Sequence, residues 1–330
     1  MLKVSSNPPV LDRRAALSLL LTLPFATSAS AQSYPDRSIR MIVPFAPGGI
    51  TDVSARLIAQ LMSVSFKQSI VVENRAGGGG TIGATAAARA EPDGYTLLVS
   101  SSATNAILPA MYEKLDYDPI KGFLPIARIS SAPYLLIVNA DVPVRSAREL
   151  ADYLKANPKF AFAAPTGTPP HILAFVFKEL TGVDVTVALY KGGGPAMTDL
   201  LGNQVQAIFQ ATTIVLPLLG DKRVRILGIA AQERSSLLPD VPTLAEQGFP
   251  LLIADSWNGL SAPAGTPADI VRRLNHGVNE ALKSAELKAT YAKLGITANI
   301  VSPNEFGVFL EEEAVRWEAL VKASKLPKVR

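Results

Sequence analysis

Four glycine-bearing turns could bind an anion, because each lies between an apolar, β-rich run and a stretch with helical character. They are Pro47-Gly48-Gly49, Gly77–Gly80, Thr166-Gly167-Thr168 and Gly192-Gly193-Gly194. Main-chain N–H groups at the start of a helix, together with the helix dipole, favour a negative charge. Glycine lets that charge approach the backbone closely. One such turn is usually an ordinary tight connection, but four in the same context predict an anion-binding cleft.

The elements around these turns alternate between strand-like and helix-like patterns. Strands are predicted at 39–45, 69–73, 95–99, 134–138, 160–164, 185–189, 205–209 and 224–229. Helices are predicted after a cap at Asp52, over 82–90, from Ser146 to about 156, from Thr168 to Gly182, over 195–201, over 267–282 and after the capping box that begins at Ser302. This alternation is typical of an α/β fold with a largely parallel sheet. Turns at the carboxyl ends of such strands lie where ligands bind, so two turns from each half could face one another.

Composition narrows the class of protein. With 330 residues, 48% of them hydrophobic, the chain is long enough for two domains. The net charge is only +4 and no run of Lys or Arg occurs, so a nucleic-acid partner is not expected. The absence of cysteine excludes disulfides and thiol catalysis. Two distant histidines, His171 and His276, do not indicate a metal site, and no cofactor is expected.

The first residues have the pattern of an export signal. Arg13-Arg14 precede the apolar stretch 15–26, and Ala29-Ser30-Ala31 supplies small residues for cleavage before Gln32. We expect a signal peptide at 1–31 and a periplasmic location, by either the general or the twin-arginine route. A buried first helix is the alternative, but Pro24 interrupts the run. No later segment approaches the 18 apolar residues of a membrane span.

Enzyme signatures are weak by comparison. Gly78, Gly80 and Gly83 fit a dinucleotide fingerprint, but the next strand ends in Ser100-Ser101-Ser102 and lacks the required acid. Neither a nucleophile elbow nor a phosphate loop occurs. His171, at a helix start, is expected to be a neutral hydrogen-bonding residue. An exported enzyme acting on a small carboxylate, or a ligand-sensing partner of a membrane signalling protein, remain as alternatives.

The chain resembles the solute-binding proteins of tripartite tricarboxylate transporters, the Bug family, along nearly its whole mature length. The matching segments are Tyr34-Pro35, 42–49 with Asp52 and Arg56, 72–83, Pro92-Asp93-Gly94-Tyr95, Tyr117-Asp118-Pro119, 190–193 with Pro195-Ala196, Leu200-Leu201-Gly202, 239–243 and 262–267. Their order and spacing together are specific, although no single motif is decisive.

The resemblance implies a two-lobed, type II-like periplasmic binding protein whose cleft, between lobes joined by hinge strands, closes over its ligand. One lobe would comprise 32–131 plus 252–330, and the other 132–251. It also implies a monomer that binds and does not catalyse. The ligand would be a small organic carboxylate, namely a di-, tri- or aromatic acid, and two integral membrane transporter subunits would be transient partners.

The resemblance further implies the residues of the ligand site. They are Phe45, Ala46, Pro47, Gly48, Gly49, Gly79, Gly80, Thr81, Ser100, Ser101, Ser102, Thr166, Gly167, Thr168, His171, Tyr190 and Gly192. Two positions depart from the family pattern: Asn105 stands where relatives often have His, and Gln210 where they often have Asp. Because an amide cannot pair ionically with a ligand ammonium, organic acids without an amine are favoured.

Three further residues have a role that the sequence leaves open. Lys191 and Arg75 adjoin glycine turns and could supply counter-charge, or they could be solvated edge residues or ion-pair partners. Trp257 could line the cleft, but packing is the preferred interpretation for an aromatic residue in an apolar run.

Overall fold

The computed structural model describes Lys3 and residues 34–329. The predicted signal peptide, 1–31, therefore lies outside these residues apart from Lys3. Contacts divide the chain after Asp36, and Arg37–Arg330 form one compact unit, which is described below. Within the described residues, no helix is both long and apolar enough to cross a membrane.

A single sheet forms the centre of this unit. Nine strands are present in the described part: β1 Ile39–Val43, β2 Ile70–Asn74, β3 Thr96–Ser101, β4 Phe123–Asn139, β5 Ala161–Pro165, β6 Thr186–Tyr190, β7 Ala207–Ala211, β8 Val224–Ile229 and β9 Asp255–Pro263. Their order is β2-β1-β3-β9-β4-β7-β5-β6, and β8 pairs with β4. β1 is parallel to β2 and β3, and β5 is parallel to β6 and β7. Each end of the sheet is thus a parallel group.

Two long antiparallel strands, β4 and β9, join the parallel groups. The first part of β4 pairs with β9 as far as Pro133↔Asp255. From Tyr134 onward β4 pairs with β7 and, from Leu135, with β8. The prediction of a largely parallel sheet is wrong in this middle region, because β9 and the first half of β4 carry polar residues and prolines that mask the strand pattern. The lobe boundaries at 131/132 and 251/252 stay a prediction. β4 changes its pairing partner from β9 to β7 between Pro133 and Tyr134, which is close to the predicted boundary at 131/132.

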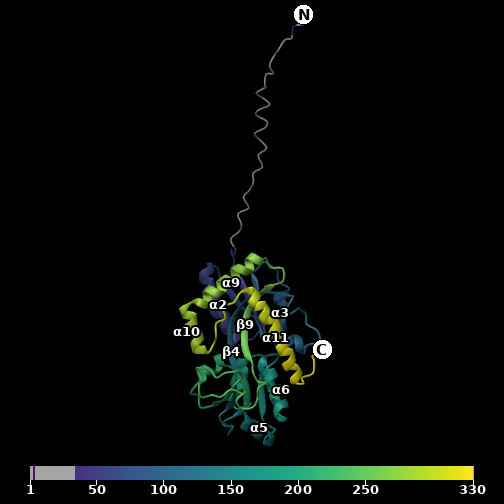
Figure 1. Cartoon of the computed structure of the whole chain (residues 1–330), viewed down its shortest axis with the longest axis vertical. Coiled ribbons are helices and arrows are strands. Elements are labelled where there is room, and N and C mark those ends of the chain that lie inside the picture. Colours follow the sequence, from purple (N-terminus) through teal and green to yellow (C-terminus); the bar gives the residue numbers. More distant parts are fainter. Residues whose placement is uncertain (1–2, 4–33, 330) are drawn as a thin grey trace. The chain divides into compact units, whose positions relative to one another are not determined.

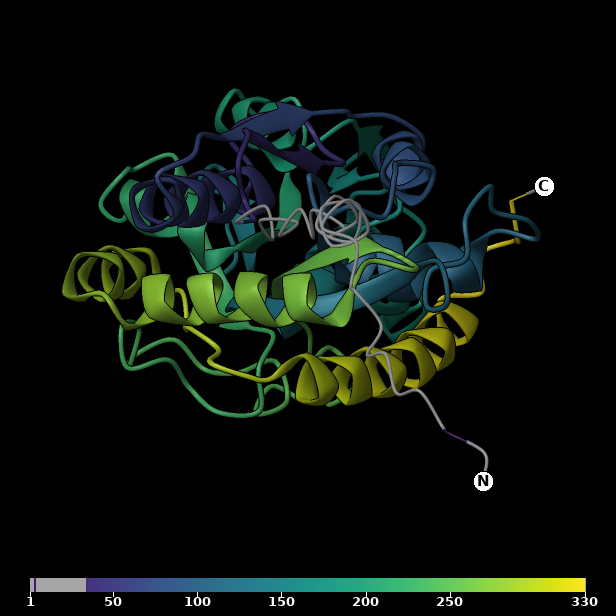
Figure 2. The same cartoon turned by 90° about the horizontal axis from the view of Figure 1, so that it is seen from above.

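The helices cover both ends of the sheet. They are α2 Ile50–Phe66, η1 Gly78–Gly80, α3 Thr81–Ala88, η2 Ala103–Ile107, α4 Leu108–Met111, α5 Ala147–Ala156, α6 Pro169–Thr181, α7 Gly193–Leu201, α8 Thr212–Val215, η3 Leu216–Leu218, α9 Ala268–Lys283, α10 Ala285–Leu294 and α11 Pro303–Ala323. In Figure 1, α2, α3, α9 and α10 lie around one end, α5 and α6 lie around the other, and β4 and β9 run between them. Figure 2 shows α9 (green) beside α11 (yellow).

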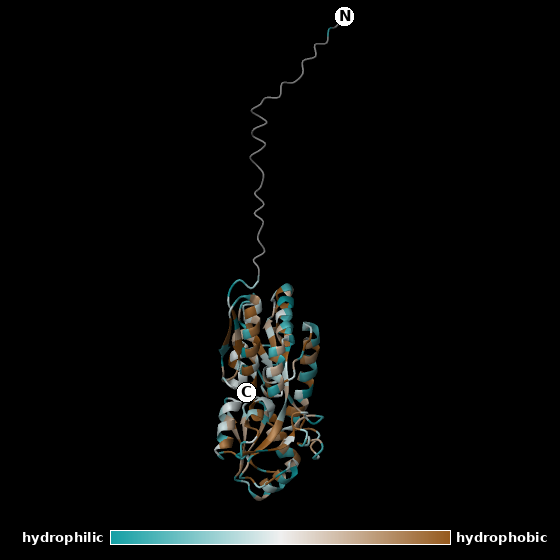
Figure 3. Cartoon of the chain, turned by 90° about the vertical axis from the view of Figure 1, so that its left-hand side faces the viewer, coloured by the Kyte–Doolittle hydropathy of each residue, from teal (hydrophilic) through white to brown (hydrophobic). Residues whose placement is uncertain are grey.

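Hydrophobic periodicity explains how these helices pack. In α9, the buried residues Val271, Leu274, Val278 and Ala281 recur every three or four positions and form one apolar face. Figure 3 shows hydrophilic and hydrophobic residues mixed along the helices, as expected for elements with one buried side. The capping box predicted at Ser302 is confirmed, since the Ser302 and Glu305 side chains each accept the other residue's backbone N–H.

The C-terminal helix α11 connects the two groups. One continuous core cluster contains Ile107 from η2, Phe162 from β5, Phe177 from α6 and Trp317 from α11. Residues from both ends of the sheet thus pack into one hydrophobic core.

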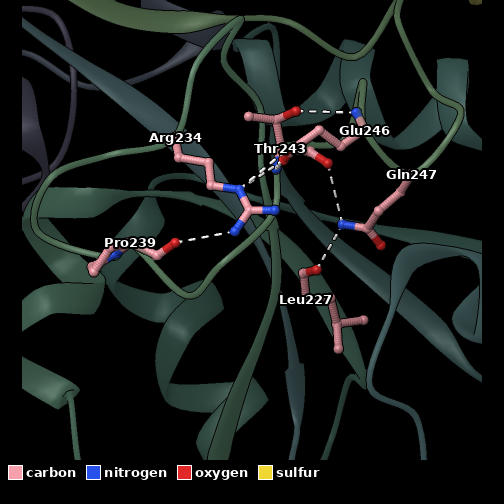
Figure 4. Close-up of polar contacts among 6 residues, drawn as sticks. All are labelled: Leu227, Arg234, Pro239, Thr243, Glu246 and Gln247. Carbon is pink, nitrogen blue, oxygen red and sulfur yellow. Dashed lines mark hydrogen bonds and ion pairs between the residues drawn. The ribbon is translucent and has the colours of Figure 1, made fainter.

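A long connection, 230–254, returns the chain from β8 to β9 and is fastened by side-chain contacts (Figure 4). Glu246 accepts hydrogen bonds from Arg234 Nε and from the Thr243 backbone N–H, at 3.0 and 2.6 Å respectively. Gln247 donates to the carbonyl oxygen of Leu227 at 2.9 Å. These contacts give the loop a fixed path and thereby fix the start of β9.

Candidate functional site

The main cavity lies where the carboxyl ends of strands from both groups meet the turns that follow them. It is open to solvent, and the space within its lining, open solvent included, is about 600 Å³. Of the residues expected in the ligand site, Phe45, Ala46, Gly49, Ser101, Ser102, Thr168, Gly192 and Gln210 line it. The cavity therefore draws on both halves of the chain, as the turns predict.

A second hollow adjoins the first, and the space within its lining, open solvent included, is about 640 Å³. The two share Phe45, Pro165 and Thr168. Four further expected residues, Gly79, Gly80, Thr166 and Tyr190, line this second hollow together with Lys191.

The four glycine turns come together at these hollows. A β-carbon built on Gly79 would lie 3.3 Å from the carbonyl oxygen of Thr166 and 3.5 Å from Cα of Gly167. A β-carbon built on Gly192 would lie 3.5 Å from Cβ of Ala46. The second turn thus lies against the third, and the fourth lies against Ala46, the residue immediately before the first turn.

The first turn is organised by Asp52. We expected Asp52 to be the N-cap of this helix. Instead, Gly49 is the N-cap of α2 and Asp52 is its third residue. Its carboxylate accepts hydrogen bonds from the Gly48 N–H at 3.1 Å, Arg56 Nε at 3.0 Å and Asn74 Nδ2 at 2.9 Å. Burial raises the pKa of Asp52, but these hydrogen bonds outweigh it and leave the pKa below its ordinary value.

The expected residues Pro47 and Gly48 in this turn are exposed and line neither hollow. They shape the connection between β1 and α2. The groups that the turn directs at the cavity belong to Gly49, Ile50 and Thr51. These residues form the N-cap and first turn of a 17-residue helix, where backbone N–H groups lack intrahelical acceptors.

In the second turn, Gly77, Gly78, Gly79 and Gly80 all have positive φ, a conformation that glycine adopts without strain. The Gly80 N–H donates to the carbonyl of Gly77 at 2.9 Å. Thr81 follows as the first residue of α3 and lines neither hollow.

The third turn offers fewer free backbone N–H groups than we expected for a helix start. α6 begins with Pro169 and Pro170, which have no N–H, and the N–H of His171 donates to the carbonyl of Thr168 at 2.9 Å. The N–H of Gly167 donates to Nδ1 of His171 at 3.3 Å. His171 is buried and lines neither hollow, and Gly167 lines neither hollow but lies against Gly79. Burial lowers the pKa of His171 to about 4, so it is neutral, as expected.

The fourth turn opens α7 and is tied to β7 by Gln210. Gln210 Nε2 donates to the carbonyl of Gly193 at 3.1 Å, and its Oε1 accepts the Ala211 N–H, also at 3.1 Å. This side chain lines the main cavity, yet both ends of its amide are engaged within the protein.

Ser100 and Asn105 lie behind the cavity wall. Ser100 Oγ donates to Ser261 Oγ at 2.7 Å. Asn105 Nδ2 donates to the carbonyl of Pro119 at 2.8 Å, and Oδ1 accepts from Thr104 Oγ1 at 2.9 Å. Both residues are buried and line neither hollow, so their side chains support the end of β3.

Charged and phenolic groups border the second hollow. Tyr190 donates its hydroxyl to Asp199 at 2.6 Å; burial and this hydrogen bond raise the pKa of Tyr190 to about 12. Lys191 lines this hollow and is exposed. Arg75 lines neither hollow and forms an ion pair with Glu73 at 2.5 Å.

Residues 54–326 match the family described as the tripartite tricarboxylate transporter family receptor, TctC. The chain belongs to the TctC family. It is 38% identical over 306 residues to protein BugT of Bordetella pertussis, which spans 92% of this chain and 94% of BugT. The structure of the periplasmic binding protein BugD is 32% identical, with a TM-score of 0.85 over 90% of this chain and all 100% of BugD. MatC from Rhodopseudomonas palustris with bound malate is 35% identical, with a TM-score of 0.84 over 87% of this chain and 100% of MatC. These similarities confirm the predicted two-lobed, type II-like fold.

Other residues, which the sequence did not single out, also line the main cavity. They are Tyr134 from β4 and Ser256 and Asn258 from β9. Trp257 packs edge-on against Phe306 and Phe309, as preferred from the sequence, and it lines the cavity as well. The sequence gives no local indication that 255–263 pairs with β3. This pairing places Asn258 opposite Ser101 and so brings β9 to the cavity.

The main cavity is uncharged. Among the described residues that line it there is no Asp, Glu, Lys, Arg or His. In the part of the chain that the structure describes, no group of three or more His, Cys, Asp or Glu side chains could hold a metal ion. The cavity can therefore offer hydroxyls, backbone N–H groups and apolar surface to a ligand.

Proposed function

We propose that this TctC-family chain is a periplasmic solute-binding protein that captures a small organic carboxylate and delivers it to two integral membrane subunits of a tripartite transporter. One observation carries the proposal: a single cavity is framed by glycine turns from both lobes and faces the first turn of α2. The binding of malate by the relative MatC supports a carboxylate as the ligand class.

The ligand carboxylate would be held by neutral donors. The N–H groups at the start of α2 and the hydroxyls of Ser101 and Ser102 offer hydrogen bonds, and the helix dipole favours negative charge there. We infer that Gly79 and Gly167 come together when the cleft closes, since the two residues approach closely. A ligand that binds the closed form more tightly than an open one shifts the equilibrium toward closure.

Binding without turnover is part of the proposal. The described lining of the main cavity contains no carboxylate or imidazole that could act as a general base. Incubating the protein with each bound acid and recovering it for NMR tests this point. Intact ligand is the expected result, and accumulation of a product would contradict it.

The test of the function is a calorimetric and thermal-shift screen of the purified protein against mono-, di- and tricarboxylates and aromatic acids. A ligand that binds only the folded state adds about 2.7 kcal/mol at a hundredfold excess over Kd. We expect at least one acid to raise Tm in this way. Failure of every acid to bind would overturn the proposal.

An uncharged cavity should also reject amines. Succinate and aspartate differ only by one ammonium group, as do propionate and alanine. Gln210 offers an amide that is already engaged, so the ammonium would be buried without a counter-charge. We expect the amine-free acid of each pair to bind more tightly, and preferential binding of the amino acids would contradict this.

Cell fractionation tests the location and the partners. We expect the processed chain in the periplasm, starting at about Gln32. Exchange of Arg13-Arg14 for Lys-Lys distinguishes the twin-arginine from the general route. Crosslinking in the presence of ligand is expected to capture the two membrane subunits.

A further inference from the structure

Glu313 of α11 is a buried carboxylate outside the ligand cavity. The residue is 6% exposed and is not among the described residues that line the main cavity. A buried carboxylate needs hydrogen bonds and a counter-charge. Arg316 supplies the counter-charge, since its Nε donates to Oε1 at 2.7 Å and its Nη2 to Oε2 at 3.0 Å. The other donors are indoles: Nε1 of Trp257 and Nε1 of Trp317 donate to Oε2 at 2.5 and 2.9 Å. One carboxylate thus binds both tryptophans of the chain.

Trp257 lies between Glu313 and the ligand cavity. Its indole lines the main cavity and also a separate hollow beside α11, which Glu313 and Arg316 line as well. The centroid of the indole lies 6.1 Å from that of Phe306 and 5.3 Å from that of Phe309, both edge-on. Rotation about the bond to an aromatic ring is broadly allowed, so ring contacts alone restrain the plane of the indole only weakly. The hydrogen bond to Glu313 fixes the N–H edge and, with it, the surface that the indole presents to the cavity.

The same carboxylate connects this cavity wall to the rest of the molecule. Trp317 belongs to the core cluster that both ends of the sheet share. Arg316 Nη1 donates to the carbonyl of Ile253 at 3.2 Å, near the end of the connection 230–254 and shortly before β9 begins. Glu313 therefore joins the cavity wall, the shared core and this connection in one hydrogen-bonded network. The members of such a network depend on one another.

We infer that Glu313 is a positioning residue for the ligand site. It holds the indole of Trp257 at the cavity wall before the ligand arrives, and it makes no contact with the ligand itself. Preorganisation of this kind lowers the cost of ordering the site on binding and so raises the affinity. The inference rests on the proposed function, because affinity for a carboxylate is one of its readouts.

A double-mutant cycle tests whether Glu313 acts through Trp257. Calorimetry compares the parent, Glu313→Ala, Trp257→Phe and the double variant, with whichever of succinate, adipate, citrate and benzoate the parent binds most tightly. We expect Glu313→Ala to weaken binding at least about fivefold in the parent but less than about twofold in the Trp257→Phe background. An equal loss in the two backgrounds, or no loss in the parent, would overturn the inference. Glu312→Ala is the matched control, because Glu312 is exposed on the same helix, and it should bind like the parent.

A spectroscopic test requires no ligand. In Trp317→Phe protein, Trp257 is the only tryptophan, and its near-UV circular dichroism reports how firmly the indole is held. We expect Glu313→Ala to reduce this signal. Glu313→Gln has nearly the size of the parental side chain and keeps an oxygen acceptor for the indole, so its signal and its affinity should lie between those of the parent and Glu313→Ala.

Thermal unfolding reports whether each variant is folded, and Glu313→Gln decides the question if Glu313→Ala does not fold. A folded Glu313 variant with both the parental Trp257 signal and the parental affinity would overturn the inference and leave the proposed function intact. If the parent binds no acid of the carboxylate screen, the proposed function fails and the inference fails with it.

Discussion

Gly79 and Gly167 meet backbone to backbone across the cleft, since a β-carbon built on Gly79 would lie 3.5 Å from Cα of Gly167. The same β-carbon would lie 3.1 Å from Leu108 Cδ2. The second and third glycine turns therefore approach each other at a point that has no room for a side chain. We propose that the two turns come together here when the cleft closes over its ligand.

Gly79→Ala should weaken ligand binding, because the methyl group obstructs closure. Gly182→Ala is the matched control: Gly182 has φ +68° against +69° for Gly79, but a β-carbon there meets nothing within 4 Å. Both variants should lose roughly 1 kcal/mol of unfolding free energy through backbone strain. Calorimetry should show a loss of affinity only for Gly79→Ala, and equal affinities in the two variants would contradict a role in closure.

Asp52→Asn should destabilise the protein at neutral pH by about 1–3 kcal/mol, because the carboxylate holds the first turn through hydrogen bonds. The folded-state pKa of Asp52 is lowered, so its contribution is present above the unfolded pKa of about 3.9 and is lost as pH falls through the folded value. Urea unfolding at several pH values should show the difference from the parent shrinking below about pH 4.

Asp269→Asn provides the control for Asp52→Asn. Asp269 lies in the first turn of α9, where it experiences a similar helix dipole, but it is exposed. Its exchange should cost far less than that of Asp52. A loss as large as that of Asp52→Asn would show that the dipole, and not the hydrogen-bonded turn, accounts for the effect.

His171 should make the protein less stable in mild acid. Its folded pKa is about 4, whereas an unfolded histidine titrates near 6.5. Between these values the unfolded chain binds more protons, so the unfolding free energy falls as pH decreases, by at most about 3 kcal/mol. His171→Asn keeps an acceptor for the Gly167 N–H and should flatten this part of the profile. An unchanged slope in His171→Asn would assign the acid sensitivity to another group.

Trp257 should report ligand binding. The indole N–H groups of Trp257 and Trp317 both donate to Glu313, at 2.5 and 2.9 Å, but only Trp257 lines the main cavity. We expect a bound acid to change the fluorescence of the parent and of Trp317→Phe, and to leave that of Trp257→Phe nearly unchanged. Retention of the full signal in Trp257→Phe would place the ligand elsewhere.

The elements with local signals were predictable from sequence. Thr168 followed by two prolines marks the start of α6, and Gly182, with φ +68°, ends it as expected. The Ser302 capping box likewise marks α11. Such signals depend on the conformation of a few neighbouring residues.

β9 was missed because its stability is not local. Ser256, Asn258 and Ser261 interrupt its apolar pattern, yet they are buried between β3 and β4. Asn258 Nδ2 donates to Ser130 Oγ at 3.1 Å, and Ser261 accepts from Ser100. Only distant pairing makes these polar residues part of a strand, and it also brings Trp257 into the cavity.

In the candidate site, too, local motifs were predictable and long-range contacts were not. The glycine turns were found because they are local motifs, and they do converge. Ser100 and Asn105 were expected to face the ligand, but tertiary hydrogen bonds turn them into the supporting structure. The helix start of α6 lacks two N–H groups, and this is readable from Pro169 and Pro170 in the sequence.

The central claim is that neutral donors at the start of α2 hold a carboxylate in an uncharged cavity. A crystal structure with the tightest-binding acid from the screen tests it most directly. The predicted result is a carboxylate within hydrogen-bonding distance of N–H groups in the first turn of α2 and of Ser101 or Ser102. A carboxylate paired instead with Lys191 or Arg75, or bound outside the main cavity, would contradict the account.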